Sequence, residues 1–185
     1  MDKITIAYKT PTTVLNLVTT FTYDASNKAT KAVTTLNGSV YQTNIFTYVG
    51  TQLSQINSTD FQGSIENVRF EYTGENISKV YQKFDAEKEY LYYEITKFDD
   101  KKITYPDAYK ALAMGLIGLT DDFYYLNKNN ALSEKLYEDH GVVYFTSDNS
   151  YEYSVTSKPT KLTAAITEDG IKRTMINTYQ YNCKW

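Results

Sequence analysis

Cysteine, histidine, tryptophan and proline are scarce in this 185-residue chain, which contains one, one, one and three of them. A single cysteine, Cys183, cannot form an internal disulfide, so the sequence excludes a disulfide-stapled scaffold. With one histidine and one cysteine, any metal site would need carboxylate ligands. Stability therefore has to come from a hydrophobic core, and a chain of this length can bury about 70% of the surface it exposes when unfolded.

The chain also lacks long hydrophobic runs and an excess of basic charge. No stretch of about 18 apolar residues is present, so no membrane-spanning helix is expected. The first residues, Met1 to Ile6, do not have the apolar stretch of a signal peptide, which leaves open a cytosolic protein or a mature form whose leader was removed. A net charge of −3 and a pI near 5.2 provide no basic stripe for phosphates, so nucleic acid is not an expected partner.

Tyrosine, by contrast, is abundant, with 19 residues, and the aromatic residues follow a pattern. Seven times the sequence has an aromatic residue, any residue and then a second aromatic residue. Side chains two apart lie on the same face of a strand, and the spacing between most pairs fits one β-hairpin per repeat. The pairs are Phe21/Tyr23, Phe46/Tyr48, Phe70/Tyr72, Tyr90/Tyr92, Phe123/Tyr125, Tyr151/Tyr153 and Tyr179/Tyr181.

The residues after each pair predict where the hairpins turn. The stretch from Tyr48 to Ile56 matches the stretch from Tyr72 to Val80 position by position, with small or polar turn formers after the tyrosine and apolar residues next. Because Leu53 and Ile56 are three apart, a regular strand would point them in opposite directions, so Leu53 is expected in the turn or at a bulge. Asn37-Gly38 and Asp169-Gly170 are typical of two-residue hairpin loops; Gln62-Gly63, residues 85–88 and His140-Gly141 are further turn candidates.

One segment breaks the strand pattern. From Pro106 to Leu119 the chain has alanine, leucine and methionine where the rest has threonine and tyrosine, which predicts a short helix that begins near Asp107. Its apolar residues surround the helix axis, as is typical of a buried helix. Gly115 and Gly118 are expected where the backbone approaches a neighbour closely.

Together these segments predict the fold class. Seven hairpins imply roughly a dozen strands, and open twisted sheets rarely exceed about 10 strands without curling. We therefore expect a mainly β protein: one domain, residues 1–185, forming a long curved antiparallel β-meander, a roll or half-barrel, built from repeated hairpins with one short buried helix near 107–119. A two-sheet sandwich is the alternative. On the other strand face, Thr19, Thr22, Thr34 and Lys79 are expected to meet water.

Three stretches resemble an uncharacterised lipoprotein family of Bacteroides-type bacteria: Phe98 to Lys102, Gly115 to Asn130 and Tyr179 to Lys184. The upstream hairpins resemble a degenerate form of tyrosine-aspartate (YD, or Rhs-type) repeats, of which Tyr23-Asp24 keeps the dipeptide itself. The resemblance implies export to the periplasm or the outer cell surface. It also implies that membrane attachment would come only from a lipid anchor on residues absent from this sequence, and it implies no activity that transfers to particular residues.

No group of residues stands out as catalytic. His140 lies beside Asp139 and Gly141 without a Ser or Cys nucleophile motif, which favours a turn residue over a general base. The pairs Asp99-Asp100 and Asp121-Asp122 have no EF-hand spacing, and Cys183 alternates with Tyr179, Tyr181 and Trp185 as a small apolar residue would. We therefore predict no catalytic residues, no metal site and no cofactor, hence not an enzyme.

The tyrosines are the remaining candidates for a ligand surface. A core accommodates many rings, but 19 tyrosines include sequence neighbours that must point to opposite faces of a strand, so some rings should be exposed and able to stack on a sugar. The candidate ligand-binding residues are Tyr92, Tyr93, Tyr105, Tyr109, Tyr124 and Tyr125. The sequence thus predicts a non-catalytic binding or structural module whose partner is a glycan or a surface protein. The alternatives are a carbohydrate-active enzyme or glycan-binding protein that uses tyrosines and acidic residues, and a carrier with a hollow interior.

Overall fold

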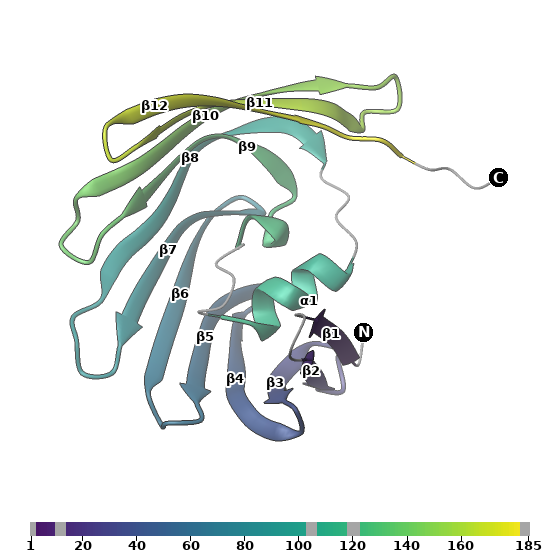
Figure 1. Cartoon of the computed structure of the whole chain (residues 1–185), viewed down its shortest axis with the longest axis vertical. Coiled ribbons are helices and arrows are strands. Elements are labelled where there is room, and N and C mark those ends of the chain that lie inside the picture. The colour runs from purple at the N-terminus through teal and green to yellow at the C-terminus, as the bar shows by residue number, and fades with distance from the viewer. Residues whose placement is uncertain (1–2, 10–13, 103–106, 118–122, 182–185) are drawn as a thin grey trace. The chain divides into compact units, whose positions relative to one another are not determined.

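The structure is a computed structural model that describes residues 3–9, 14–102, 107–117 and 123–181. Its described strands form one 12-stranded sheet in which each strand neighbours the next along the chain (Figure 1). The predicted antiparallel β-meander of hairpins is therefore confirmed, and the strands do not divide into two separately hydrogen-bonded sheets. The strands are β1 (Lys3–Lys9), β2 (Val14–Tyr23), β3 (Ala29–Leu36), β4 (Ser39–Val49), β5 (Gln52–Asp60), β6 (Ile65–Thr73), β7 (Asn76–Phe84), β8 (Tyr90–Lys102), β9 (Asn129–Tyr137), β10 (Val143–Tyr153), β11 (Pro159–Glu168) and β12 (Ile171–Thr178).

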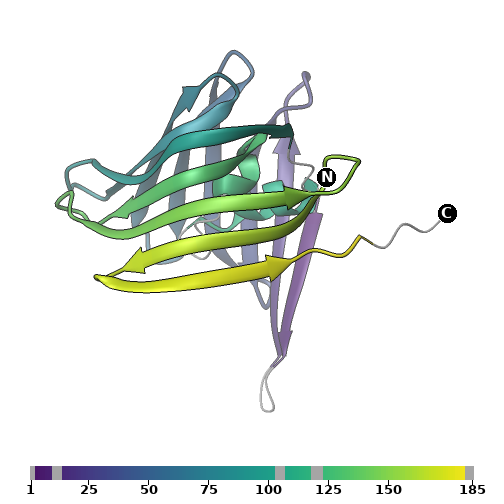
Figure 2. The ribbon, with the colours of Figure 1, turned by 90° about the horizontal axis from the view of Figure 1, so that it is seen from above.

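The chain divides into two compact units. Unit 1 comprises Met1–Glu71, Tyr81–Glu89 and Tyr105–Leu126, and unit 2 comprises Tyr72–Val80, Tyr90–Thr104 and Asn127–Trp185. In unit 1 the helix α1 (Asp107–Gly115) lies beside strands β1 to β5, and a 3₁₀ helix η1 (Phe123–Leu126) follows it (Figure 1). In unit 2 the strands β8 to β12 follow one another as antiparallel ribbons (Figure 2). The single-domain organisation stays a prediction.

Five of the seven aromatic pairs lie in strands, on β2, β4, β6, β8 and β10. Phe21 and Phe46, from successive hairpins, are buried with ring centroids 6.4 Å apart. Two pairs were misread. Phe123 and Tyr125 belong to the 3₁₀ helix η1, which follows α1 and is not part of a hairpin. Tyr179 and Tyr181 follow the end of β12.

A β-bulge recurs after the second aromatic residue of three pairs. The pairing register shifts beside Tyr23, Tyr48 and Tyr153, which leaves Thr30, Ser54 and Thr160 as the extra residues on the partner strands. Each of these hydroxyls donates a hydrogen bond across the bulge, to the carbonyls of Thr22, Thr47 and Glu152 at 3.3, 3.0 and 3.1 Å. The prediction that Leu53 lies in the turn or at a bulge is confirmed, because Leu53 pairs with Tyr48 directly beside the extra residue Ser54. In these three hairpins the extra residue at the bulge is therefore a Ser or Thr, and its hydroxyl pairs with the carbonyl that the bulge would otherwise leave without a partner.

The predicted hairpin tips are also present. Asn37 and Gly38 have φ of 50° and 89°, and Asp169 and Gly170 have φ of 50° and 78°, as a two-residue loop with positive φ at both positions requires. Gly63, Asp85 and Gly141 also have positive φ in turns, which confirms the three further candidates Gln62-Gly63, residues 85–88 and His140-Gly141.

The helix begins at Asp107, as predicted, and the described helix ends at Gly115; Gly118 and Leu119 lie outside the described residues. Ala113 and Gly115 are buried, whereas Tyr109 and Lys110 are exposed. Thr19 and Thr34 were expected to meet water but are 3% and 1% exposed. Thr19 lies two residues before Phe21 and therefore shares its buried face, and Thr34 is paired with Thr19 across β2 and β3.

Gly115 is needed for the close approach of α1 to the sheet, as its sequence position suggested. A Cβ at this position would lie 2.8 Å from Thr19 Cγ2 and 3.3 Å from Phe21 Cζ. We expect Gly115→Ala to destabilise the protein by about 1 to 2 kcal/mol, because the overpacking cost of about 1 to 3 kcal/mol exceeds the helix-propensity gain, which is small at a helix end. Urea denaturation measures the change. In the background of Thr19→Ser, which removes Cγ2, the same substitution should cost much less, and an equal cost in both backgrounds would contradict the contact.

Candidate functional site

Buried polar side chains form a band across the α1-facing side of unit 1. They are Thr19 on β2, Thr34 on β3, Gln42 and Asn44 on β4, and Ser58 on β5, each at most 5% exposed. Cross-strand pairing explains their alignment, because directly opposed residues point to the same face: Thr34 pairs with Gln42, and Asn44 pairs with Ser58.

The band binds the carbonyls at the end of α1. Thr34 Oγ1 donates to the Gly115 carbonyl at 3.0 Å, Asn44 Nδ2 to the Met114 carbonyl at 2.9 Å, and Gln42 Nε2 to the Ile117 carbonyl at 2.7 Å. The last carbonyls of a helix have no partner within the helix, so these side chains act as its C-cap. Polar residues in the core of unit 1 thus fix where the helix ends over the sheet.

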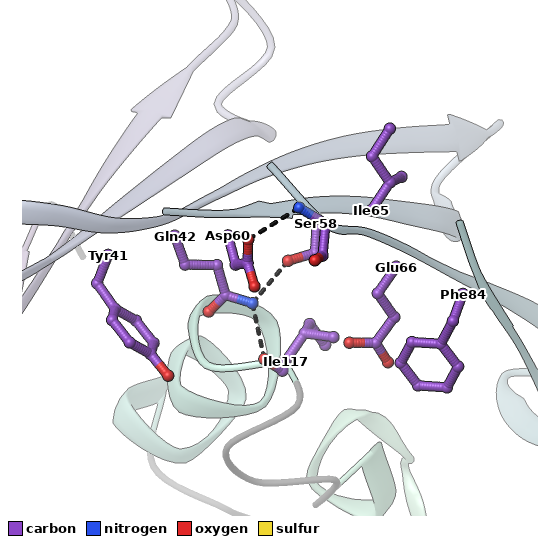
Figure 3. Close-up of a pocket in the computed structure, with 9 residues that line it drawn as sticks. Tyr41, Gln42, Ser58, Asp60, Ile65, Glu66, Phe84 and Ile117 are labelled. Carbon is purple, nitrogen blue, oxygen red and sulfur yellow. Dashed lines mark hydrogen bonds between the residues drawn. The ribbon is translucent and has the colours of Figure 1, made fainter. Parts of the chain in front are cut away.

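At one end of this band lies a pocket of about 170 Å³ (Figure 3). Gln42, Ser58 and Glu66 line the pocket, as does Ile117, just beyond α1. Gln42 Nε2 also donates to Ser58 Oγ at 2.6 Å, so the amide is held by two bonds (Figure 3). The other lining residues are Tyr41, Asp60, Ser64, Ile65 and Phe84.

A β-bulge places Tyr41 at this pocket. Thr34 pairs with Gln42 and Thr35 pairs with Val40, so Tyr41 is the extra residue of β4. Consecutive residues of a regular strand point to opposite faces, whereas a bulge redirects a side chain, and both Tyr41 and Gln42 line the pocket. The Tyr41 ring stacks on Phe61 with centroids 5.7 Å apart.

Two carboxylates line the same pocket. Glu66 pairs directly with Ser58 across β5 and β6, and Asp60 lies two residues beyond Ser58 on the same face, so the two acids are diagonal neighbours on that face. Asp60 Oδ1 accepts the backbone amides of Gln62 and Ser64 at 2.8 and 2.9 Å, which closes the β5–β6 turn. Glu66 accepts a bond from Gln82 Nε2 at 3.2 Å.

The main polar cluster of unit 2 has a structural role. Asp99 accepts the backbone amides of Lys101 and Asn130 at 3.1 and 3.0 Å, and also Asn130 Nδ2 at 2.9 Å and the Tyr153 hydroxyl. Burial, then the bond to Asp99, raises the pKa of Tyr153 well above its usual value. Every partner in this cluster is satisfied within it, so it stabilises the contact of β8, β9 and β10 rather than presenting groups to a ligand.

The six tyrosines predicted to bind a ligand fall in both units. In unit 1, Tyr109 and Tyr125 have ring centroids 5.0 Å apart, and Tyr125 and Tyr124 have centroids 4.2 Å apart. In unit 2, Tyr93 is 6% exposed and its hydroxyl donates to Glu134, while Tyr92 is half-buried on the other face of β8. Tyr105 lies outside the described residues. The ligand-binding role of these residues stays a prediction.

A different tyrosine, Tyr48, should make stability depend on alkaline pH. Burial, then the nearby charge of Asp24, raises its pKa from 10.0 to about 12. Because the folded pKa is the higher one, the stability linked to the neutral phenol is complete below pH 10 and is lost as pH rises towards about 12. We expect Tyr48→Phe to flatten the fall in unfolding free energy between pH 10 and 12, measured by urea denaturation. An unchanged slope would show that Tyr48 does not carry the effect.

The other sequence candidates are placed as follows. His140 lies in the exposed turn between β9 and β10, with Nε2 3.1 Å from Glu138 Oε2 and Nδ1 beside Asp139. Within the described ranges, no group of three or more His, Cys, Asp or Glu side chains could hold a metal ion. Asp121, Asp122, Cys183 and Trp185 lie outside the described residues. The pocket was not predicted from the sequence. Its one signal there is the pair Asp60 and Glu66 on either side of the Gln62-Gly63 turn.

Comparison with solved structures shows a likeness in fold. The fold is similar to the crystal structure of a porin-like protein from Bacteroides uniformis, with a TM-score of 0.55 and 16% sequence identity over 93% of this chain and 73% of that one. At this identity the likeness shows a shared fold. No family model matches the chain. No curated protein matches it either, so the resemblance to lipoproteins and to YD repeats stays a prediction. Among the described helices, none is long and apolar enough to cross a bilayer.

Proposed function

We propose that this protein belongs to the bacterial cell envelope, where it acts as a non-catalytic binding or structural module. The observation that carries the proposal is the fold shared with a porin-like protein of a Bacteroides species over 93% of the chain. It agrees in bacterial group with the lipoprotein resemblance of Phe98–Lys102, Gly115–Asn130 and Tyr179–Lys184. The periplasm or the outer cell surface is the proposed location, with a lipid anchor as the proposed attachment.

Cell fractionation tests the location. The natural gene, with any coding sequence upstream of Met1 and a C-terminal epitope tag, is expressed in a Bacteroides host. We expect the tagged protein in the detergent-released envelope fraction, labelled by an alkynyl palmitate analogue. Recovery in the cytosol would contradict the envelope proposal, whereas recovery in the envelope without palmitate label would contradict only the anchor.

The proposed partner is a glycan or a surface protein, bound by the tyrosine cluster of Tyr109, Tyr124 and Tyr125. Tyr109 is 43% exposed and contacts the ring of Tyr125, so the cluster offers aromatic surface to solvent. Aromatic faces of this kind stack on the apolar faces of sugars. A glycan array should show binding that Tyr109→Ala removes and Tyr181→Ala, which truncates an exposed tyrosine of unit 2, does not. Equal binding by both variants would contradict this surface.

The carbohydrate-active enzyme is the second candidate, favoured by the two carboxylates at the unit 1 pocket. Two acids on facing strands are the minimum that glycoside hydrolysis requires. However, Asp60 Oδ1 is occupied by two turn amides, which is a structural role and supports the non-catalytic proposal. Release of reducing ends from bacterial or dietary polysaccharides, abolished by Glu66→Gln, would favour the enzyme instead.

A further inference from the structure

The pocket of unit 1 has an unusual balance of chemistry, because acceptors and aromatic rings meet there without a cationic side chain. Asp60 and Glu66 contribute carboxylates, and no lysine, arginine or histidine is among the described residues that line the pocket. Carboxylates form their strongest hydrogen bonds with charged N–H donors, and aromatic faces attract cations. The pocket therefore selects a ligand that is positively charged and rich in donors.

The amide of Gln42 adds an acceptor whose orientation is fixed. The Ile117 carbonyl can only accept, so the group that contacts it at 2.7 Å must be Nε2. Oε1 is consequently turned to the Tyr41 side (Figure 3), and it has no hydrogen-bond partner among the described residues although Gln42 is 5% exposed. A buried acceptor without a donor is uncommon. Its unpaired oxygen adds negative potential beside the pocket without itself contacting a ligand there.

Asp60 also retains acceptor capacity. Both turn amides bond to Oδ1, and no hydrogen bond to Oδ2 occurs within the described part of the chain. A carboxylate has about four acceptor sites, so holding the turn leaves room for a ligand. Asp24 provides a close comparison, because its Oδ1 accepts the amides of Ser26 and Lys28 at 2.8 and 2.9 Å in the β2–β3 turn, away from the pocket lining.

The rest of the lining is apolar and partly exposed. Phe84 and Ile65 are 39% and 44% exposed, and the bulge that redirects Tyr41 brings its ring to the opposite side of the pocket from Phe84 (Figure 3). The volume of about 170 Å³ is below the 300 Å³ or more of a site for a drug-sized molecule. The space therefore suits one charged head group with a short hydrocarbon stem.

We propose that this pocket binds a small alkylammonium ion, with the ammonium group between Asp60 and Glu66 and the stem between the rings of Tyr41 and Phe84. The inference builds on the binding role proposed above and gives it a second site with its own ligand class. Its test uses purified protein, so failure of the envelope location and failure of the pocket are separate outcomes.

The test is a ¹H–¹⁵N NMR titration of the full chain at low salt with three probes of similar size. These are n-butylammonium chloride, 1-butanol, which lacks the charge, and tetramethylammonium chloride, which lacks N–H donors. We expect n-butylammonium to shift the amides of Gln62 and Ser64 and the side-chain amide of Gln42 saturably. The amides of Ser26 and Lys28, which make the same turn contacts with Asp24, should not shift.

Matched variants identify the groups responsible. Asp60→Asn and Glu66→Gln should each weaken n-butylammonium binding about tenfold or more, because each removes a charge-assisted bond. Asp24→Asn makes the same change in an equivalent turn and should leave the affinity unchanged. Urea denaturation of Asp60→Asn and Asp24→Asn verifies that both remain folded.

Four results would overturn the proposal. Saturable binding of 1-butanol at the same affinity would show an apolar pocket, and equal affinity for tetramethylammonium would remove the role of the acceptors. Parallel shifts at Ser26 and Lys28 would indicate a general salt effect. Unchanged affinity of both Asp60→Asn and Glu66→Gln would show that the carboxylates do not hold the ion.

Discussion

Asp99→Ala should destabilise the protein by about 4 kcal/mol, the largest effect that we expect from any single side-chain truncation in unit 2. The substitution leaves the backbone amides of Lys101 and Asn130 without their acceptor and removes the acceptor of the Tyr153 hydroxyl. It also removes one of the two acceptors of Asn130 Nδ2, which donates to the Tyr153 hydroxyl oxygen as well. Asn130 is 3% exposed, so water cannot replace these bonds without opening the strands. Hydrogen bonds to a charged group contribute about 1.5 to 3 kcal/mol each, and their losses are not additive.

The neighbouring carboxylate provides the control for this prediction. The side chain of Asp100 is 84% exposed and pairs only with Lys101 in the described structure, so Asp100→Ala should change the unfolding free energy by less than about 0.5 kcal/mol. Asp99→Asn keeps an acceptor for the amides of Lys101 and Asn130, so its loss of stability should lie between those of Asp99→Ala and Asp100→Ala. Urea denaturation at pH 7 measures all three variants. If Asp99→Ala and Asp100→Ala were equally stable, the cluster would not hold β8, β9 and β10 together.

The same variant has a spectroscopic signature. Burial and the bond to Asp99 raise the pKa of Tyr153, so a tyrosine of the native wild type should ionise later than free tyrosine. In Asp99→Ala, absorbance at 295 nm should show one phenol titrating at lower pH. Absence of this shift, with the stability loss present, would mean that the loss comes from the backbone amides alone.

The hairpin repeat could be read from the sequence because its determinants are local. Each turn depends on a few adjacent residues, such as Asn37-Gly38, and the bulge near Leu53 follows from the spacing of two apolar residues within one strand. The helix start at Asp107 is local in the same sense. Phe123 and Tyr125 were misread because an aromatic pair at a spacing of two has the same appearance in a 3₁₀ helix, where only the surrounding chain distinguishes the two.

The buried polar residues could not be predicted, because their partners are distant in sequence. Thr34, Gln42 and Asn44 bond to carbonyls 81, 75 and 70 residues away. In a strand, a threonine, asparagine or glutamine normally indicates the face that is exposed to solvent. Here α1 covers that face and buries these side chains, which the strand sequences alone do not indicate. The pocket could not be predicted for the same reason. In the sequence Asp60 and Glu66 only flank a turn, and they become part of a pocket because the fold places the distant residues Phe84 and Ile117 beside them.

Asn76→Ala is the second large effect that we expect, about 3 kcal/mol of destabilisation. Asn76 is 8% exposed at the start of β7, and its Oδ1 accepts the backbone amides of Lys128 and Asn129 at 2.8 and 3.0 Å, while Nδ2 donates to Asn129 Oδ1 at 2.9 Å. In return, Asn127 Oδ1 accepts the amide of Ile77 at 2.6 Å. These side-chain bonds join the start of β7 to residues 127–129, where they take the place of backbone hydrogen bonds between strands. Truncation of Asn76 leaves the amides of Lys128 and Asn129 without this acceptor.

Two further variants separate the bonds that Asn76 makes. Asn76→Asp keeps the acceptor for Lys128 and Asn129 but loses the donor to Asn129 Oδ1, so it should cost less than Asn76→Ala. Asn177→Ala, on the exposed strand β12, should change stability by less than about 0.5 kcal/mol. Hydrogen exchange of the Lys128 and Asn129 amides gives a local readout, and it should accelerate in Asn76→Ala at denaturant concentrations where the rest of unit 2 stays protected. Unchanged exchange of both amides would mean that the bonds from Asn76 are not formed in solution.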